Sequence, residues 1–514
     1  MARVVATGAF QGYEPGGYFC EMLGSPDRPC ADAEAVFTRF DAAGIEELRA
    51  RASDAEIELF NQGITFTVYT ERDAIDRILP FDVVPRVIGA ADWDRIERGV
   101  VQRVTVLNLF LSDIYGPQRA IRDGIVPAEL VLANPNYRAV MQGMEQPHGT
   151  WVHINGTDLV RDQDGQFLVL EDNARTPSGV SYVVENRHLM LRSFSDLMDD
   201  LPVRPVSDYG RRLHEALCEV APPGVLDPQV VLLSPGVFNS AYFEHVFLAR
   251  EMGVPLVEGR DLVVENDRVY MRTIAGPVPV DVVYRRVDDD FLDPLTFRED
   301  SMLGVPGIVG AYRKGTVSLA NAIGTGVADD KAVYAYLPRL TKYYLGQEAI
   351  LDNVPTHICR EPEALRYTLD HMHELVVKPV GASGGYGICI GPRASKAELE
   401  ACRAELLADP ANFISQPMIR LSVSPTLTED GTAPRHVDLR PFAVTGSSTW
   451  VLPGGLSRVA LKKGSLIVNS SQGGGSKDTW VLAGDRPRTG GQQQGASPPA
   501  GGQSPSPPAG GQSQ

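Results

Sequence analysis

Apolar residues recur at helical or strand spacing along most of the chain. Between Asp92 and Tyr115 they return every three or four positions, which predicts a helix with one buried face (Trp93, Ile96, Val100, Val104, Leu107 and Leu111). The runs Val230–Leu233 and Leu375–Val377 are short and bounded by turn residues, as expected of buried strands. The more polar N-terminal part predicts the start of a helix within residues 41–48.

Residues 228–290 have a different pattern. The strand Val230–Leu233 is followed by a turn at residues 234–236, a helix from Ala241 to Met252 and a second strand at residues 255–257. This order is typical of an α/β unit with parallel strands. No G-x-G-x-x-G follows the first strand, so a dinucleotide site is not indicated.

Side chains that suit a metal ion lie on a predicted hairpin. Asp164-Gly165 is a turn signal between two strand-like stretches. Pairing of these stretches brings Asp158 towards Glu171 and Asn173, and the last two share a face because they are two residues apart. Two carboxylates and an amide oxygen suit Mg²⁺ that bridges nucleotide phosphates. The alternative is a solvated hairpin face, and the cluster described next favours the metal.

That second cluster is a lysine followed by a glycine-rich segment. Lys378 closes the strand Leu375–Val377, and the segment after it contains Gly381, Ser383, Gly384, Gly385 and Gly387. Glycine lets backbone N–H groups approach an anion closely, and the lysine adds a positive charge. The pattern is not a P-loop, because there the lysine follows the glycines. We interpret the segment as a phosphate-binding loop, and a hairpin turn without a ligand is the alternative.

Composition and charge narrow the class of protein. The 514 residues suffice for two or more domains, and 43% hydrophobic and 22% charged residues are close to globular averages. The net charge of −17 disfavours nucleic acid and anionic membranes as partners, because both require basic surfaces. No apolar run reaches 18 residues and no signal-peptide core is evident, so we expect a cytoplasmic protein. Six cysteines without metal-ligand spacing are expected to be reduced.

The last thirty residues differ in composition from the rest. Residues 485–514 are dominated by Pro, Gly, Gln and Ser, and the octapeptide at 497–504 is repeated at 506–513. Such a segment buries too little apolar surface to offset the entropy of ordering, which predicts a disordered tail. A spacer is the simplest role, and a Pro-rich site for a protein partner is the alternative.

The motifs together resemble those of the circularly permuted ATP-grasp family, type 2, which is related to the ligase domain of glutathionylspermidine synthase. The resemblance extends from about Tyr13 to Trp480 and is strongest at residues 170–181, 377–379 and 468–478. In ordinary ATP-grasp enzymes the lysine and glycine loop precede the metal ligands, whereas here they follow them. The resemblance implies an α+β fold in which ATP and Mg²⁺ lie between two lobes.

The resemblance also implies a domain organisation. We expect an N-terminal helical cap region at residues 1–90, a lobe carrying the metal hairpin at 91–225 and a Rossmann-like subdomain at 226–325. A lobe carrying the lysines and the glycine-rich loop follows at 326–484, and the tail at 485–514.

Further residues receive roles from the same resemblance. Lys331, in Asp330-Lys331-Ala332, matches a lysine that contacts ATP phosphate, and Gln416 lies where the hinge between the lobes meets adenine. Arg440 and Arg458 are candidates for contacts to phosphate or acyl-phosphate and complete, with Lys378, the catalytic set. The alternatives are a surface lysine and arginines paired with acidic neighbours.

The substrate side is less marked. Arg285 and Arg286 precede three aspartates, so either could grip a substrate carboxylate, and an arginine–aspartate network is the alternative. Gly156 stands where glutathionylspermidine synthases carry an arginine, and Arg161 or Arg175 are candidates to replace it. We also include Arg175 among the substrate candidates. No histidine is an evident general base, and His153, just before the hairpin, is the one to test.

The function implied is an ATP-dependent carboxylate–amine ligase. A small-molecule or peptide carboxylate would take the γ-phosphoryl group, and an amine would then displace phosphate to give an amide, with ADP released. Two alternatives remain open. One is an ATP-binding scaffold, favoured by the missing arginine at Gly156; the other is a phosphotransferase on the same fold.

Overall fold

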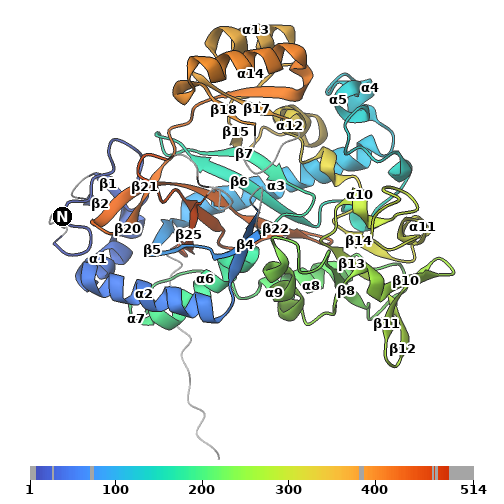
Figure 1. Ribbon diagram of the computed structural model, residues 1–514, viewed down its shortest axis with the longest axis horizontal. Coiled ribbons are helices and arrows are strands. Elements are labelled where there is room, and N and C mark those ends of the chain that lie inside the picture. The colour runs from blue at the N-terminus through green and yellow to red at the C-terminus, as the bar shows by residue number, and fades with distance from the viewer. Residues whose placement is uncertain are drawn as a thin grey trace, which may run out of the picture. The chain divides into compact units, whose positions relative to one another are not determined.

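The computed structural model describes residues 7–25, 28–69, 74–380, 387–465, 468 and 473–484. The chain divides into two compact units, Met1–Ala483 and Gly484–Gln514. All helices and strands of the described part belong to the first unit, whereas the predicted tail lies outside the described residues (Figure 1). None of these helices is long and apolar enough to cross a membrane.

A large, mostly antiparallel sheet forms the centre of the first unit. Its ten strands are β5 (Phe81–Ile88), β6 (Ile154–Arg161), β7 (Phe167–Asn173), β15 (Asp352–Asn353), β20 (Val423–Thr428), β21 (Gly431–Arg440), β22 (Phe442–Thr445), β23 (Thr449–Val451), β24 (Leu456–Val459) and β25 (Gly475–Val481). The main path runs β15-β7-β6-β21-β24-β25-β5, and β5 pairs in parallel with β25. This sheet therefore joins strands from three of the expected ranges, 1–90, 91–225 and 326–484.

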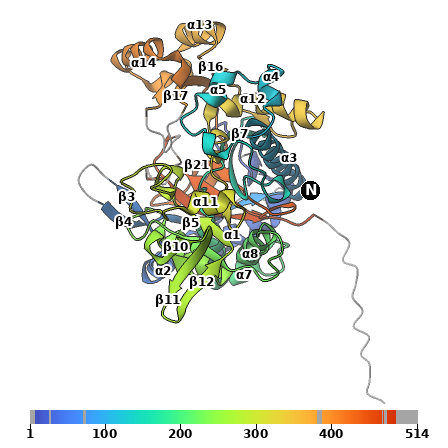
Figure 2. The same cartoon turned by 90° about the vertical axis from the view of Figure 1, so that its right-hand side faces the viewer.

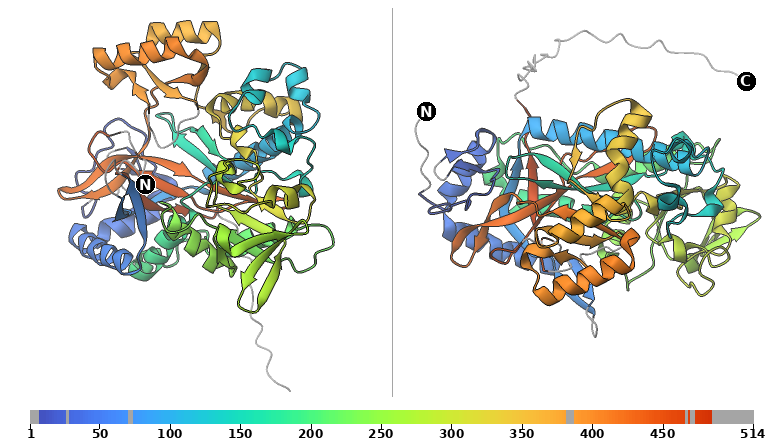
Figure 3. Two further views of the ribbon diagram at one scale, coloured as in Figure 1. Left: turned by 45° about the vertical axis from the view of Figure 1, so that its right-hand side comes forward. Right: turned by 90° about the horizontal axis from the view of Figure 1, so that it is seen from above.

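Alternation along the strands gives the sheet two different faces. Leu159, Val169 and Leu439 point to one face and pack against α3 (Ala90–Ile114), the helix predicted from its apolar spacing. The long light-blue ribbon of α3 lies along the sheet in the view from above (Figure 3). The opposite face carries Ile154, Phe442 and Leu456, which pack with the apolar side of α6 (Val180–Ser193). The charged candidates of β6, β7, β21 and β24 lie on that second face.

The expected helix start within residues 41–48 is confirmed, because α2 (Ile45–Asn61) begins at Ile45. α1 (Glu34–Ala43) ends just before Gly44. The φ of 78° and ψ of 162° at Gly44 are accessible essentially only to glycine, so the helical conformation is interrupted between α1 and α2. The Asp41 carboxylate accepts bonds from the backbone N–H groups of Gly8 (3.1 Å) and Phe10 (2.9 Å), which ties the N-terminal segment to α1.

The predicted α/β unit is confirmed. β8 (Val230–Leu233) has the predicted bounds, and α9 (Tyr242–Met252) and β9 (Leu256–Val257) follow it. With β13 (Val282–Arg285) and β14 (Ser318–Ala320) these strands form a parallel sheet in the order β14-β13-β8-β9. A separate antiparallel sheet contains β10 (Leu262–Glu265), β11 (Arg268–Thr273) and β12 (Gly276–Val280) (Figure 2).

A smaller antiparallel sheet carries the strand that ends in the lysine. Its order is β16-β19-β17-β18, with bounds His357–Ile358, Phe413–Pro417, Leu375–Pro379 and Cys389–Ile390. Helices α13 (Pro362–His371) and α14 (Lys396–Ala408) lie beside it (Figure 1). α12 (Lys331–Leu345) leads from the parallel sheet towards this one.

The remaining elements are short or peripheral. They are α4 (Arg119–Arg122), α5 (Ala128–Leu132), α7 (Ser195–Met198), α8 (Tyr209–Glu219), α10 (Asp289–Leu292), α11 (Ile308–Arg313), β1 (Leu23–Ser25), β2 (Arg28–Pro29), β3 (Thr65–Tyr69) and β4 (Ala74–Ile78).

Candidate functional site

The predicted hairpin exists, and its register places the candidate oxygen ligands together. β6 and β7 pair with Asp158 opposite Glu171 and Gly156 opposite Asn173. Opposed residues of an antiparallel pair point to the same face, so all four positions share one face of the large sheet. Asn173 Nδ2 lies 3.4 Å from Asp158 Oδ1 and 3.1 Å from the Gly156 carbonyl oxygen.

Two arginines from the neighbouring strands converge on Asp158. Arg440 donates through Nε to Oδ1 and through Nη2 to Oδ2 (2.8 Å), while Arg458 Nη2 donates to Oδ2 (2.7 Å). Burial alone would raise the pKa of Asp158, but the two guanidinium groups outweigh it and hold that pKa well below its usual range. Asp438 of β21 lies opposite Arg458 of β24, and its Oδ1 accepts a hydrogen bond from Arg458 Nε (2.9 Å). Asp158 therefore neutralises arginines in this structure.

Both candidate lysines lie near Glu171. Lys331 is the first residue of α12, and its Nζ lies 3.4 Å from Glu171 Oε2. Lys378, on β17, donates to Gln416 Oε1 (2.6 Å) on the paired strand β19. Burial lowers the pKa of Lys378 to about 8; the charge of Glu171 opposes this shift and that of Lys331 adds to it.

The glycine-rich loop is only partly described. Gly381, Ser383, Gly384 and Gly385 lie outside the described residues. Gly387 has a φ of 70°, and a Cβ there would come within 3.0 Å of Pro379 Cγ at the end of β17. Both features require glycine at this position.

Arg285 and Arg286 differ from what a substrate-gripping pair requires. Their side chains are 1% and 2% exposed. Arg285 donates to the backbone carbonyls of residues 287, 321 and 322 and pairs with Asp289 (2.7 Å). Arg286 donates to the Pro177 carbonyl (2.6 Å) and pairs with Glu244 (3.2 Å). These guanidinium groups hold backbone segments together, in a buried form of the predicted arginine–acid network.

Arg175 is placed differently. It lies two residues after Asn173, its side chain is 36% exposed, and it pairs with Asp329 through Nε at 2.6 Å. Arg161, the other replacement considered for the arginine absent at Gly156, is the last residue of β6 and pairs with Asp92 (2.6 Å). Of the two, Arg175 lies next to the candidate ligands.

His153 is buried and unsuited to proton transfer at neutral pH. Burial lowers its pKa to about 3, and its Nδ1 has no hydrogen-bond partner within the part of the chain that is described. A ring that stays neutral and enclosed does not serve as a general base near pH 7.

Sequence reasoning missed the residues that hold this site together. Asp438 is two positions before Arg440 on the same strand, so alternation alone would have placed both on one face. Arg103 of α3, which pairs with Asp172 behind the hairpin (2.7 Å), and Asn321, after β14, carry no local signal of their contacts.

A cavity of about 440 Å³ beside the end of α3 contains none of the candidate residues; it is lined in part by Ser112, Met144 and Trp151.

Glu171 and Asn173 are the residues here that fit a divalent cation. Glu171 is 29% exposed and presents a carboxylate next to an amide on the same strand face. Among the described residues no three His, Cys, Asp or Glu side chains surround a common point. Such a sparse set fits Mg²⁺, which commonly takes one or two protein carboxylates and obtains its other ligands from phosphate and water.

Comparison with known proteins gives a consistent family. The model of the circularly permuted ATP-grasp proteins of type 2 matches residues 85–460. An uncharacterised protein of Synechocystis sp. is 51% identical over 475 residues, covering 92% of this chain and 99% of the relative. An uncharacterised protein of Mycobacterium tuberculosis is 51% identical over 466 residues, covering 90% and 84%.

Two further similarities concern named proteins. A Frankia alni protein provisionally named glutamate–cysteine ligase 2-3 is 44% identical over 472 residues; the match covers 91% of this chain and 54% of that protein. A glutathione synthetase-like effector from Globodera pallida has a similar fold, with a TM-score of 0.56 at 12% identity, over 85% of this chain and 98% of the effector.

Proposed function

We propose that this chain, which belongs to the circularly permuted ATP-grasp family of type 2, is an ATP-dependent carboxylate–amine ligase. The observation that carries the proposal is the pair of lysines beside the hairpin: Lys331 Nζ lies 3.4 Å from Glu171 Oε2, and Lys378 is close enough for the charge of Glu171 to act on it. A cluster of two cations beside a carboxylate and an amide is suited to a nucleotide polyphosphate and its metal ion.

The lysines are proposed to hold the phosphates. Lys331 begins the helix α12 and Lys378 lies on the strand β17, so a phosphate bound between them would bridge these two elements. Gln416, held by Lys378 and by Thr356 Oγ1 (2.9 Å), is proposed to lie on the adenine side. Gly381, Ser383, Gly384, Gly385 and Gly387 remain proposed as the loop that covers the phosphates.

Mg²⁺ is proposed to be held by Glu171 and Asn173. When bound, it would neutralise charge on the phosphates and so favour phosphoryl transfer. Asp158, the third predicted ligand, contributes negative charge next to them while its own oxygens hold Arg440 and Arg458. We therefore assign Asp158 first to the placement of these arginines.

The proposed reaction has two steps. A substrate carboxylate oxygen attacks the γ-phosphorus, the bond to the bridging oxygen breaks, and ADP leaves. An amine nitrogen then attacks the acyl carbon of the acyl-phosphate, phosphate leaves, and the ammonium proton passes to solvent. Arg440 and Arg458, rigidly paired to Asp158 and Asp438, are proposed to stabilise charge on the transferring group, for which one preorganised donor is worth roughly 3 kcal/mol.

The substrates are proposed only as classes. Arg175 is 36% exposed beside Asn173, and we propose that it binds the carboxylate of the acid. We no longer include the buried Arg285 and Arg286 in this role. The name of the Frankia relative makes glutamate and cysteine the first acid and amine to test, although the match covers 54% of that protein. A cytoplasmic location agrees with six cysteines free of disulfides, and partner binding by the tail stays a prediction.

ATP turnover in the presence of defined substrate pools tests the proposal. Wild type and Lys378→Ala are incubated with Mg²⁺, ATP and pools of amino acids and polyamines, and ADP and amide products are measured. We expect ADP release that requires both an acid and an amine and that is lost in Lys378→Ala. Turnover that needs no amine and leaves a stable phosphorylated product would instead support a phosphotransferase.

One observation favours the scaffold as the second candidate. Gly156 lacks the arginine of the glutathionylspermidine synthases, and the nearby Arg440 is engaged by Asp158. Tight binding of Mg·ATP without turnover in any pool would support an ATP-binding scaffold.

A further inference from the structure

The open end of the metal hairpin is closed by a side chain from outside the hairpin. Asn321, directly after β14, accepts at Oδ1 the backbone N–H groups of His153 (2.7 Å) and Ile154 (2.8 Å). Its Nδ2 donates to the carbonyls of Ile154 (2.7 Å), Ala174 (2.8 Å) and Arg175 (3.1 Å). One buried amide thus bonds to the start of β6 and to the residues that follow β7.

Asp329 binds the N–H groups of the same two residues whose carbonyls Asn321 binds. Its Oδ1 accepts the N–H groups of Ala174 and Arg175 (3.2 Å for the latter), and its Oδ2 accepts Arg175 Nε (2.6 Å). Asp329 is thereby fixed to the residue after Asn173, and it lies two residues before Lys331. The next residue, Asp330, caps α12 by accepting the N–H groups of Ala332 (2.8 Å) and Val333 (3.2 Å).

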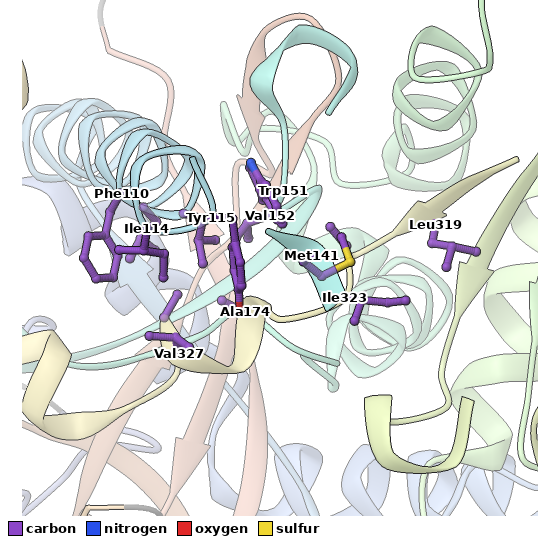
Figure 4. Close-up of a cluster of buried hydrophobic side chains, with 14 of the residues drawn as sticks. Phe110, Ile114, Tyr115, Met141, Trp151, Val152, Ala174, Leu319, Ile323 and Val327 are labelled. Atoms are coloured by element: carbon purple, nitrogen blue, oxygen red, sulfur yellow. The ribbon is translucent and has the colours of Figure 1, made fainter. Parts of the chain in front are cut away.

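The apolar core also packs the segment before α12 against the residues that follow β7. Ala174, Ile323 and Val327 are buried in one cluster with Tyr115 and Trp151. Figure 4 shows Ala174 beside the side chain of Tyr115. The segment from Asn321 to Asp330 is therefore anchored by packing and by hydrogen bonds along its length. The contact between Lys331 and Glu171, at 3.4 Å with both side chains partly exposed, is too weak to fix this arrangement by itself.

We propose that Asp329 is a positioning residue that sets the spacing between Lys331 and the Glu171–Asn173 strand. The inference rests on the proposed binding of Mg·ATP at these residues. Asp329 acts through the backbone of Ala174 and Arg175 and touches no substrate. Its ion pair with Arg175 is secondary to the backbone bonds, because those bonds fix the position of the strand end.

Substitutions separate the backbone bonds from the ion pair. Asp329→Ala removes both. Asp329→Asn keeps an acceptor oxygen for the two N–H groups but loses the charge that pairs with Arg175, and Arg175→Ala removes only the ion pair. Asp41→Ala is the matched control, because Asp41 also binds backbone N–H groups but at the end of α1.

The measurement is the Kd of Mg·ATP by titration calorimetry, with thermal melting of each variant. Hydrogen bonds to a charged group are strong enough that Asp329→Ala is expected to raise the Kd about tenfold. Asp329→Asn is expected to raise it about threefold, and Arg175→Ala less than Asp329→Ala. Asp41→Ala is expected to lower the melting temperature and leave the Kd unchanged. If Asp329→Ala does not fold, Asp329→Asn carries the test.

Each failure has its own signature. Wild-type affinity in Asp329→Ala overturns the inference and leaves the ligase proposal intact. Where only Asp329→Asn folds, a Kd no higher than that of Arg175→Ala overturns it, because the charge on the backbone bonds would then contribute nothing beyond the ion pair. Equal losses in Asp329→Ala and Arg175→Ala would show that the ion pair, not the backbone anchor, matters, and equal losses in Asp41→Ala would show a global effect. If wild type does not bind Mg·ATP, the proposed function fails and the inference falls with it.

Discussion

The buried pair of Arg103 and Asp172 is expected to control the stability of the hairpin that carries the candidate site. Arg103 Nε lies 2.9 and 2.7 Å from the two oxygens of Asp172, and Nη1 donates to Asn353 Oδ1 (2.8 Å). The two side chains are 5% and 1% exposed. Asp172 lies between Glu171 and Asn173 and points to the opposite face of the sheet, so its pairing fixes which face those residues present.

Arg103→Met leaves the Asp172 carboxylate buried with neutral partners only, among them Thr157 Oγ1 at 3.3 Å. Breaking a buried ion pair from one side costs about 3–5 kcal/mol, because the remaining charge keeps its desolvation penalty. The carboxylate is fully enclosed, so no discount for solvent screening applies. In the double variant Arg103→Met, Asp172→Asn the uncompensated charge is absent, and we expect at least about 2 kcal/mol of the loss to be recovered.

Urea unfolding followed by tryptophan fluorescence and circular dichroism measures these free energies. The two single variants and the double variant form a double-mutant cycle with the wild type. A cost below about 1 kcal/mol for Arg103→Met would contradict the reasoning. So would a double variant whose loss equals the sum of the single losses, because the two charges would then be energetically independent.

Three further perturbations follow from single contacts. Because burial lowers the pKa of Lys378 to about 8, its amine is cationic below that pH and neutral above it. Calorimetry is expected to show that the affinity of wild type for Mg·ATP falls by up to about tenfold per pH unit above pH 8, whereas that of Lys378→Arg stays constant. A constant affinity in wild type would refute the role of Lys378. A Cβ at Gly156 would lie 3.1 Å from Arg440 Cδ, so Gly156→Ala is expected to lower kcat at unchanged ATP affinity; an unaltered kcat would remove Arg440 from the catalytic set. A Cβ at Gly99 would lie 2.4 Å from Leu351 Cγ, so Gly99→Ala should cost about 1–3 kcal/mol in thermal melts, with Leu351→Ala relieving the clash; equal stability in the single and double variants would argue against that close approach.

Local patterns predicted individual elements well. The apolar spacing in residues 92–115 gave a helix that the structure places at Ala90–Ile114, and the run Val230–Leu233 is a strand with the predicted bounds. The turn at Asp164-Gly165 and the two-residue spacing of Glu171 and Asn173 placed the hairpin and its face. These predictions succeeded because periodicity and turn chemistry are properties of neighbouring residues.

The failures came where the outcome depends on distant residues. Residues 41–48 do contain the start of α2, but the pattern did not show that α1 ends within the same stretch. From their position beside three aspartates, Arg285 and Arg286 were candidates to bind a substrate. In the structure their N–H groups donate to the backbone carbonyls of residues 177, 321 and 322. No local signal shows whether an arginine is exposed or enclosed.

The sequence by itself therefore determined the inventory of this protein: the hairpin with its carboxylates and amide, the lysine at the end of a strand, and the family to which they point. Only the tertiary structure decided how these parts are used. It brings Lys331 to Glu171 and pairs Asp158 with Arg440 and Arg458, which are 282 and 300 residues away in sequence. It leaves Glu171 and Asn173 as the accessible oxygen ligands. The physical reason is that charge pairing and burial are set by neighbours in space, which a linear pattern of residues does not specify.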